Sequence, residues 1–137
     1  MKNKAYVSLQ FNHDGSKVLG GTKDGYVVEF DLASGTTKSH LCDSRFQEDQ
    51  NAVCYSKQNP NHAFSGGDNG LVTCWDTRLF GTKEGAVGYL AGHMDGITYI
   101  DTAKEEIRKS KHLSIEFFSS TKFIFLSLKG WLDSSDE

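Results

Sequence analysis

Short stretches of alternating apolar and polar residues recur along the chain, separated by turns rich in Gly, Asn and Asp. Alternation with a period of two is typical of half-buried β-strands, and an Asp-Gly pair between two such stretches indicates a tight hairpin. The pattern predicts strands over residues 6–11, 17–20, 26–30, 36–41, 51–55, 63–65, 71–75, 86–90 and 96–100. We therefore expect residues 5–100 to form antiparallel meander sheets.

The pattern repeats itself, because residues 21–31 align without a gap on residues 66–76, at an offset of 45 residues. The second copy ends in Trp75-Asp76, and Gly92-His93 follows it. A period of about 40–45 residues with these two marks is the signature of a WD-repeat blade, so the chain resembles the WD-repeat β-propellers. Blades close a ring in sets of about four to eight. The expected fold is all-β: a WD-repeat β-propeller fragment of two blades and the start of a third, open and incomplete.

The partial propeller is expected over residues 5–103, with repeat one at 5–45, repeat two at 46–91 and the start of repeat three at 92–103. After Asp101 the pattern fails, and residues 104–137 form a divergent tail with a charged stretch and an aromatic run. This tail either supplies two substitute strands or is foreign to the fold. We favour the second interpretation, because an acidic ending and a lost repeat are typical of a truncated or alternatively ended product.

A complete WD repeat contains a buried hydrogen-bonded chain of one His, one Ser or Thr, one Asp and one Trp. The resemblance implies this structural role for Asp24, Ser65, Asn69, Trp75, Gly92 and His93. Both copies depart from the pattern, since Phe46 and Asn69 stand at the His and Asp positions of repeat two, and Phe30 replaces the Trp of repeat one. Most of the stability must then come from apolar packing, which we expect of Phe11, Val18, Val28, Phe64, Val72 and Trp75.

Three stretches are closely similar to one subgroup of the family: residues 18–25, 64–78 and 90–101. This subgroup is the WD-repeat protein twenty-three type, a substrate receptor of cullin-4 RING ubiquitin ligases. The resemblance covers about residues 5–103 and is most specific over residues 92–101. It implies docking onto the propeller-shaped adaptor of the ligase, the damaged-DNA-binding protein, and presentation of a client that the resemblance leaves unnamed.

The docking mark of such receptors, Trp-Asp-x-Arg, is matched by Trp75-Asp76-Thr77-Arg78. An Arg just past the third strand of a blade stands at the rim of one propeller face, where its planar fork can pair with a partner carboxylate or carbonyl. Docking requires a guanidinium that is accessible to solvent and free of a tight internal partner. The competing interpretation is that Arg78 is simply solvated or pairs internally with an Asp such as Asp68.

Charge and composition limit the kinds of partner and compartment to be expected. The formal net charge is -3 and the 15 Lys and Arg residues are scattered, so direct nucleic-acid binding is not expected. The longest apolar segment, residues 123–128, is too short to span a bilayer, and the N-terminus does not have the pattern of a signal peptide. Three cysteines, Cys42, Cys54 and Cys74, favour a reducing compartment. The resemblance implies an intracellular protein of cytoplasm and nucleus.

Enzymatic chemistry has no pattern to support it. No histidine pairs with another histidine or with a cysteine at zinc-ligand spacing. Gly20-Gly21-Thr22-Lys23 lacks the spacing of a phosphate loop, and Ser65-Gly66-Gly67 is not a nucleophile elbow. We expect no enzyme, metal or cofactor. The alternatives to a ligase receptor are a generic WD-repeat scaffold without a ligase link and a non-functional truncated product.

Overall fold

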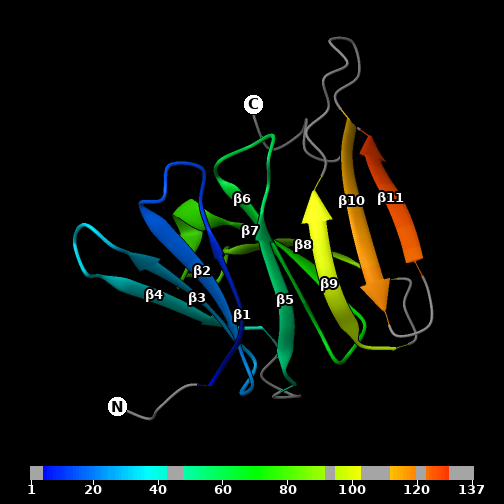
Figure 1. Cartoon of the computed structure of the whole chain (residues 1–137), viewed down its shortest axis with the longest axis horizontal. Helices are drawn as coiled ribbons and strands as arrows, with labels where there is room; N and C mark the ends of the chain where they lie inside the picture. Colours follow the sequence, from blue (N-terminus) through cyan, green and yellow to red (C-terminus); the bar gives the residue numbers. More distant parts are fainter. Residues whose placement is uncertain (1–4, 43–47, 92–94, 103–111, 120–122, 130–137) are drawn as a thin grey trace.

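The computed structural model describes residues 5–42, 48–91, 95–102, 112–119 and 123–129, which form three antiparallel sheets (Figure 1). Sheet one contains β1 (Tyr6–Phe11), β2 (Lys17–Thr22), β3 (Tyr26–Asp31) and β4 (Thr37–Leu41). Sheet two contains β5 (Gln50–Tyr55), β6 (His62–Gly67), β7 (Val72–Asp76) and β8 (Ala86–Leu90), with the 3-10 turn η1 (Thr77–Leu79) after β7. Sheet three contains β9 (Ile97–Thr102), β10 (His112–Ser119) and β11 (Phe123–Lys129).

The strands of each sheet follow one another along the chain, and every neighbouring pair is antiparallel. The first nine strands lie where the alternation predicts them, with ends that differ by at most two residues. Both predicted hairpins are present: Gly25 and Gly70 have φ of 86° and 75° at equivalent turns, a conformation that glycine adopts at little cost. The expected meander is confirmed. The sheets are open, and the described strands do not close a ring.

Sheet two is buried on both faces, because its successive side chains alternate between two apolar clusters. One cluster lies between sheets one and two and contains Leu19, Val27, Val53, Tyr55, Ala63, Trp75 and Phe80. The other joins sheets two and three and contains Ala52, Cys54, Phe64, Val72, Cys74, Ile97 and Ile100. Four of the residues expected in the core are buried: Val28, Phe64, Val72 and Trp75. Phe11 is not, since it is 63% exposed on the outer face of sheet one.

The first strands of the sheets, β1, β5 and β9, lie side by side at the centre of the molecule (Figure 1). As an edge strand, β5 needs hydrogen-bond partners from outside its own sheet. Gln10 Oε1 accepts from the Tyr55 backbone N–H at 2.6 Å, and Ser8 Oγ accepts from that of Val53 at 3.3 Å. Just beyond the end of β5, Thr102 Oγ1 of β9 accepts from the Lys57 backbone N–H at 3.0 Å. These three bonds each join residues 45 positions apart, which is the length of the repeat.

The segment after Asp101 takes part in the fold. β10 pairs with β9 through Phe117 and Ile100, and it pairs with β11 through Phe117 and Ile124. Residues 104–137 therefore provide two strands of sheet three, which is the alternative to our preferred interpretation of a foreign tail. Sequence reasoning failed here because the two strands lack both the Asp-Gly hairpin and the Trp-Asp mark. In the described part of the chain, no helix has the length and apolar character that crossing a membrane requires.

The packing of sheet two predicts that truncating two of its aromatic residues changes the free energy of unfolding by different amounts. Phe64→Ala removes a side chain with no solvent exposure, so the free energy of unfolding should fall by about 3–5 kcal/mol. Tyr89→Ala, on the outer strand β8 and 58% exposed, should change it by less than about 1 kcal/mol. Urea unfolding followed by circular dichroism measures both changes. Equal losses would contradict the assignment of Phe64 to the core.

Candidate functional site

Trp75 forms the buried base of the candidate site. Its side chain has no solvent exposure, and its indole Nε1 donates to Ser65 Oγ at 2.9 Å. The His40 ring packs edge-on against it at a centroid distance of 4.8 Å, and the Phe80 ring stacks on it at 5.5 Å. Trp75 therefore joins β4 of sheet one to β6 and to the segment after η1, and its place in the blade is structural.

The polar chain expected around Trp75 is only partly present. Ser65 is within 3.9 Å of the Cys42 thiol, whereas Asn69 Oδ1 accepts from the Leu71 backbone N–H at 3.0 Å and so stabilises its own hairpin. Phe46, Gly92 and His93 lie outside the described residues. Sequence reasoning missed His40 and Cys42, which lie beside Trp75 and Ser65. Their only signal in the sequence is their position at the end of the preceding repeat, His40 on β4 and Cys42 directly after it.

Sheet one keeps a smaller version of this cluster around Asp24. The Thr22 hydroxyl donates to Asp24 Oδ1, and Thr22 Oγ1 accepts from the Tyr26 backbone N–H at 3.0 Å. Asp24 thus holds Thr22 across the β2–β3 hairpin. Phe30 stands at the Trp position of this repeat, and because its ring has no polar atom it cannot donate the hydrogen bond that Trp75 donates in sheet two.

Asp76 fixes the direction in which the chain leaves β7. Its side chain caps η1 by accepting from the Arg78 backbone N–H at 3.0 Å. It also accepts from Arg78 Nε at 3.0 Å and from Arg78 Nη2 at 2.7 Å. These hydrogen bonds hold the pKa of the Asp76 carboxyl below its usual range, chiefly through the Arg78 side chain. Asp76 is therefore the residue that orients Arg78.

The Arg78 side chain is 59% exposed while that of Asp76 is only 10% exposed. The expected accessibility of the guanidinium is thus present, but the expected lack of an internal partner is not. An internal partner is Asp76, two residues earlier, whereas Asp68 accepts from Asn51 Nδ2 at 2.6 Å. The sequence could have indicated this pair, because a carboxylate at an N-cap lies within reach of a side chain at the second position of the turn.

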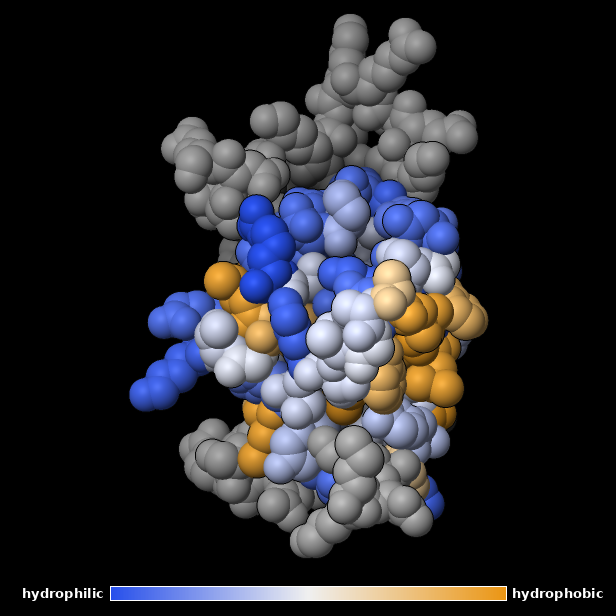
Figure 2. Space-filling model, turned by 90° about the vertical axis from the view of Figure 1, so that its left-hand side faces the viewer, coloured by the Kyte–Doolittle hydropathy of each residue, from blue (hydrophilic) through white to orange (hydrophobic). Residues whose placement is uncertain are grey.

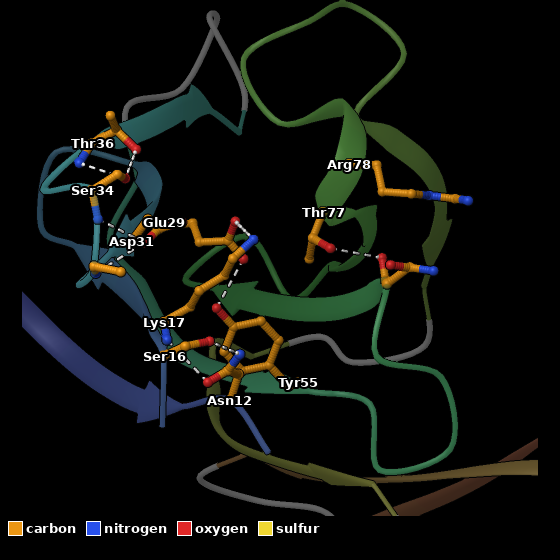
Figure 3. A network of polar contacts seen from close by, with 12 residues as sticks. Asn12, Ser16, Lys17, Glu29, Asp31, Ser34, Thr36, Tyr55, Thr77 and Arg78 are labelled. Atoms are coloured by element: carbon orange, nitrogen blue, oxygen red, sulfur yellow. Dashed lines mark hydrogen bonds and ion pairs between the residues drawn. The ribbon is translucent and has the colours of Figure 1, made fainter. Parts of the chain in front are cut away.

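A polar groove lies beside Arg78 where sheets one and two meet. Figure 3 shows Lys17 and Glu29 of sheet one pointing toward Tyr55 of sheet two, while the Arg78 side chain extends away from them. The groove has a volume of 390 Å³ and is lined by Asn12, Asp14, Ser16, Lys17, Glu29, Lys38, Tyr55, Pro60, Asn61, Thr77 and Arg78. Arg78 is therefore one side chain of a larger polar surface that spans two sheets.

Glu29 lies at the base of the groove as a buried carboxylate, 4% exposed. The Tyr55 hydroxyl donates to Glu29 Oε2 at 2.9 Å, and Lys17 Nζ lies 3.7 Å from Glu29 Oε1. Burial, followed by the adjacent Glu29 charge, raises the pKa of Tyr55, so the hydroxyl keeps its proton and remains a donor. Because an unpartnered buried charge is costly, this contact ties sheet one to sheet two.

The described residues contain no group of three His, Cys, Asp or Glu side chains that could hold a metal ion. Burial raises the pKa of the Cys74 thiol to about 12 and also raises that of Cys54. A thiol that keeps its proton is a poor nucleophile.

Several named proteins are similar in sequence to this chain. The DDB1- and CUL4-associated factor 11 homologue of Caenorhabditis briggsae is 30% identical over 123 residues, 87% of this chain. The homologue of Caenorhabditis elegans is 28% identical over 127 residues, 90% of the chain. The LEC14B protein of Lithospermum erythrorhizon is 34% identical over 95 residues, 69% of the chain. The chain spans only about a fifth of the length of these relatives, 20% to 22%.

No protein-family profile matches the chain. Among solved structures, the crystal structure of the RRP9 WD40 repeats matches 95% of this chain with a TM-score of 0.65 and 15% identity, over 40% of its own length. This match shows the WD40 fold. The similarity to the C. briggsae protein covers more residues than the segment 1–103 contains, so it continues into the part of the chain that supplies the last strands.

The Asp76–Arg78 pair should give a stability difference that depends on pH. Asp76→Asn keeps a cap for η1 but removes the charge, so at about pH 7 it should lower the free energy of unfolding by roughly 0.5–1 kcal/mol, as for an exposed ion pair. Since the folded-state pKa of Asp76 is depressed, the contribution of the charge exists above the ordinary Asp pKa and is lost as the pH falls through the folded value. Urea unfolding down to about pH 3 should show the two proteins converging. Glu84→Gln, at an exposed loop position, is the control, and a constant difference at all pH values would contradict the ion-pair contribution.

Proposed function

We propose that this chain, which has the WD40-repeat fold and is homologous to the DDB1- and CUL4-associated factor 11 proteins, is a protein-interaction module of a cullin-4 ubiquitin ligase. In this function it docks onto the damaged-DNA-binding-protein adaptor and presents a client for ubiquitination. It acts by binding rather than by catalysis. The proposed location is inside the cell, in cytoplasm and nucleus, which suits three free thiols.

The observations that carry the proposal are the similarity to the DDB1- and CUL4-associated factor 11 proteins and the exposure of Arg78. The tight pair with Asp76 departs from the unpaired guanidinium expected of a docking residue, so docking has to use Arg78 in the direction in which Asp76 holds it. A long side chain loses conformational entropy when it is immobilised at an interface. Two hydrogen bonds to Asp76 immobilise Arg78 beforehand, so less entropy remains to be lost on docking. The Asp76–Arg78 ion pair is neutral as a whole, although the guanidinium keeps its charge. Because Arg has five N–H donors, the pair with Asp76 is compatible with a further hydrogen bond to a partner carbonyl, hydroxyl, amide or carboxylate oxygen.

The adjoining groove extends this surface. Lys38 is exposed on β4, and Lys17 is partly exposed above Glu29, so donors from sheet one face the same opening as Arg78. Because the groove straddles two sheets, a partner seated there contacts both repeats. A docking surface of this kind depends on the relative position of the sheets, which Glu29 and Tyr55 hold together.

The internal pairing of Arg78 favours a second candidate, a WD-repeat scaffold without a ligase link. In that function Asp76 and Arg78 serve only to turn the chain from β7 into η1. The two candidates differ in one measurable property, the effect of Arg78 on adaptor binding at unchanged stability.

We expect Arg78→Ala to weaken binding of the purified adaptor by at least about tenfold, since truncating a charged interface anchor typically costs about 2–5 kcal/mol. Biolayer interferometry gives the dissociation constant, and thermal unfolding of the same samples gives the stability. Lys83→Ala, at an exposed basic position in the loop before β8, is the matched control and should bind as the wild type. Unchanged binding by Arg78→Ala would favour the scaffold. A loss of binding that only parallels a loss of stability would make Arg78 structural.

A further inference from the structure

Leu79, the residue after Arg78, is a large apolar side chain exposed beside the docking surface. It is 37% exposed, whereas Phe80 after it is buried and stacks on Trp75 at 5.5 Å. The segment belongs to sheet two, which packs against sheet one on one face and sheet three on the other. Leu79 thus lies between two side chains that are held in place, Arg78 by Asp76 and Phe80 by Trp75.

The backbone around Leu79 is fixed as well. Its carbonyl oxygen accepts from the Thr82 N–H at 3.0 Å and from Thr82 Oγ1 at 2.7 Å. Gly81 turns the chain with φ of 85°, and a Cβ atom added to Gly85 would lie 2.9 Å from the same carbonyl oxygen. The segment from η1 to β8 therefore closes on itself in a tight turn. A side chain displayed by such a turn needs little further ordering of its backbone when a partner binds it.

Exposure alone does not mark Leu79 as a contact, because single apolar side chains are common on protein surfaces. Figure 2, which views the molecule from the side of sheet one, shows other apolar side chains in its middle band. The equivalent turn of repeat one is more informative, since it shows which residues the turn itself requires.

Repeat one makes this turn without a cation or a large apolar side chain. Asp31, at the end of β3, accepts from the Ala33 backbone N–H at 3.0 Å and from that of Ser34 at 3.2 Å. These are the second and third residues after the Asp, the positions that Arg78 and Leu79 occupy in repeat two. An Asp-capped turn therefore forms here with two small residues. Since the turn requires neither Arg nor Leu, their presence together favours a role in binding.

We propose that Leu79 is the apolar contact of the adaptor-docking surface, and that it enters an apolar pocket of the adaptor beside the group that Arg78 binds. The inference rests on the docking function proposed above. Interfaces typically have an apolar centre with Arg enriched beside it and a polar rim around it. The polar groove supplies such a rim, because its lining includes Arg78 and does not include Leu79. The partner surface is therefore an apolar pocket flanked by oxygen acceptors.

The test measures binding of the full chain to the purified adaptor by biolayer interferometry, beside the thermal midpoint of each variant. Leu79→Gln removes the apolar contact and adds no charge beside Arg78, so the dissociation constant should rise by about tenfold or more. Leu79→Met, which remains apolar, should recover most of the affinity that Leu79→Gln loses. Val87→Gln is the matched control and should bind as the wild type, since Val87 is apolar and 39% exposed on β8.

The salt dependence separates an apolar contact from an electrostatic one. The ratio of the dissociation constants of Leu79→Gln and the wild type should agree within about twofold at about 0.05 M and about 0.5 M NaCl, because salt screens charges and not apolar burial. A ratio that falls toward one at high salt would assign the effect to the charge of Arg78 and would overturn the proposal.

A cross-linking measurement avoids any loss of affinity. An apolar amino acid that carries a diazirine should cross-link to the adaptor from position 79 and not from position 87, as identified by mass spectrometry. Cross-links of equal yield from both positions would contradict a specific contact at Leu79.

Failure of this inference and failure of the proposed function give different results. A wild-type chain that does not bind the adaptor would overturn both. Binding that Arg78→Ala weakens and Leu79→Gln leaves unchanged would overturn only the role of Leu79. A loss of binding by Leu79→Gln that its lower thermal midpoint accounts for, or an equal loss by Val87→Gln, would overturn that role as well.

Discussion

Trp75 loses all contact with solvent by packing between two sheets, and this burial is the interaction on which the rest of the molecule depends. A four-stranded sheet has two faces, and an apolar face in water must be covered by another sheet or helix. Sheet two satisfies this requirement on both sides, with Trp75 toward sheet one and Phe64 toward sheet three. Sheets one and three each pack on sheet two through one face. Their positions in the molecule therefore depend on how closely they fit against sheet two.

Small residues make that close fit possible. A Cβ atom added to Gly66 would lie 2.6 Å from Ile97 Cγ2, so the backbone of β6 approaches β9 as closely as only glycine allows. Gly21 has the same position in sheet one, where an added Cβ would meet the Gln50 carbonyl oxygen and lie 3.1 Å from Val53. The repeat thus conserves a spacing between sheets as well as a strand pattern. Because Asp76 and Arg78 follow directly from β7, their positions also depend on this spacing between the sheets.

Much of this arrangement can be predicted from the sequence, because strand alternation and glycine turns act over only a few residues. The positions of β1 to β9, the two hairpins and the role of Trp75 all follow from local patterns. What could not be predicted depends on contacts between repeats. The His40 ring beside Trp75, the Glu29–Tyr55 contact and the pairing of β10 with β9 each join segments that carry no shared motif. The partner of Arg78 was misjudged although it is local: Asp76 is only two residues away, but the more distant Asp68 was named instead.

The hydrogen bonds between β1, β5 and β9 have a consequence for the order of folding. Each hairpin within a sheet closes a short loop, whereas each bond between first strands joins residues 45 positions apart. Closing the longer loop costs more chain entropy, which grows with the logarithm of loop length, and non-local contacts form late. Hairpins should therefore arise first and collide later as preformed units, with each junction between neighbouring sheets formed in a separate step. The strands and hairpins should therefore form before the surface where sheets one and two meet.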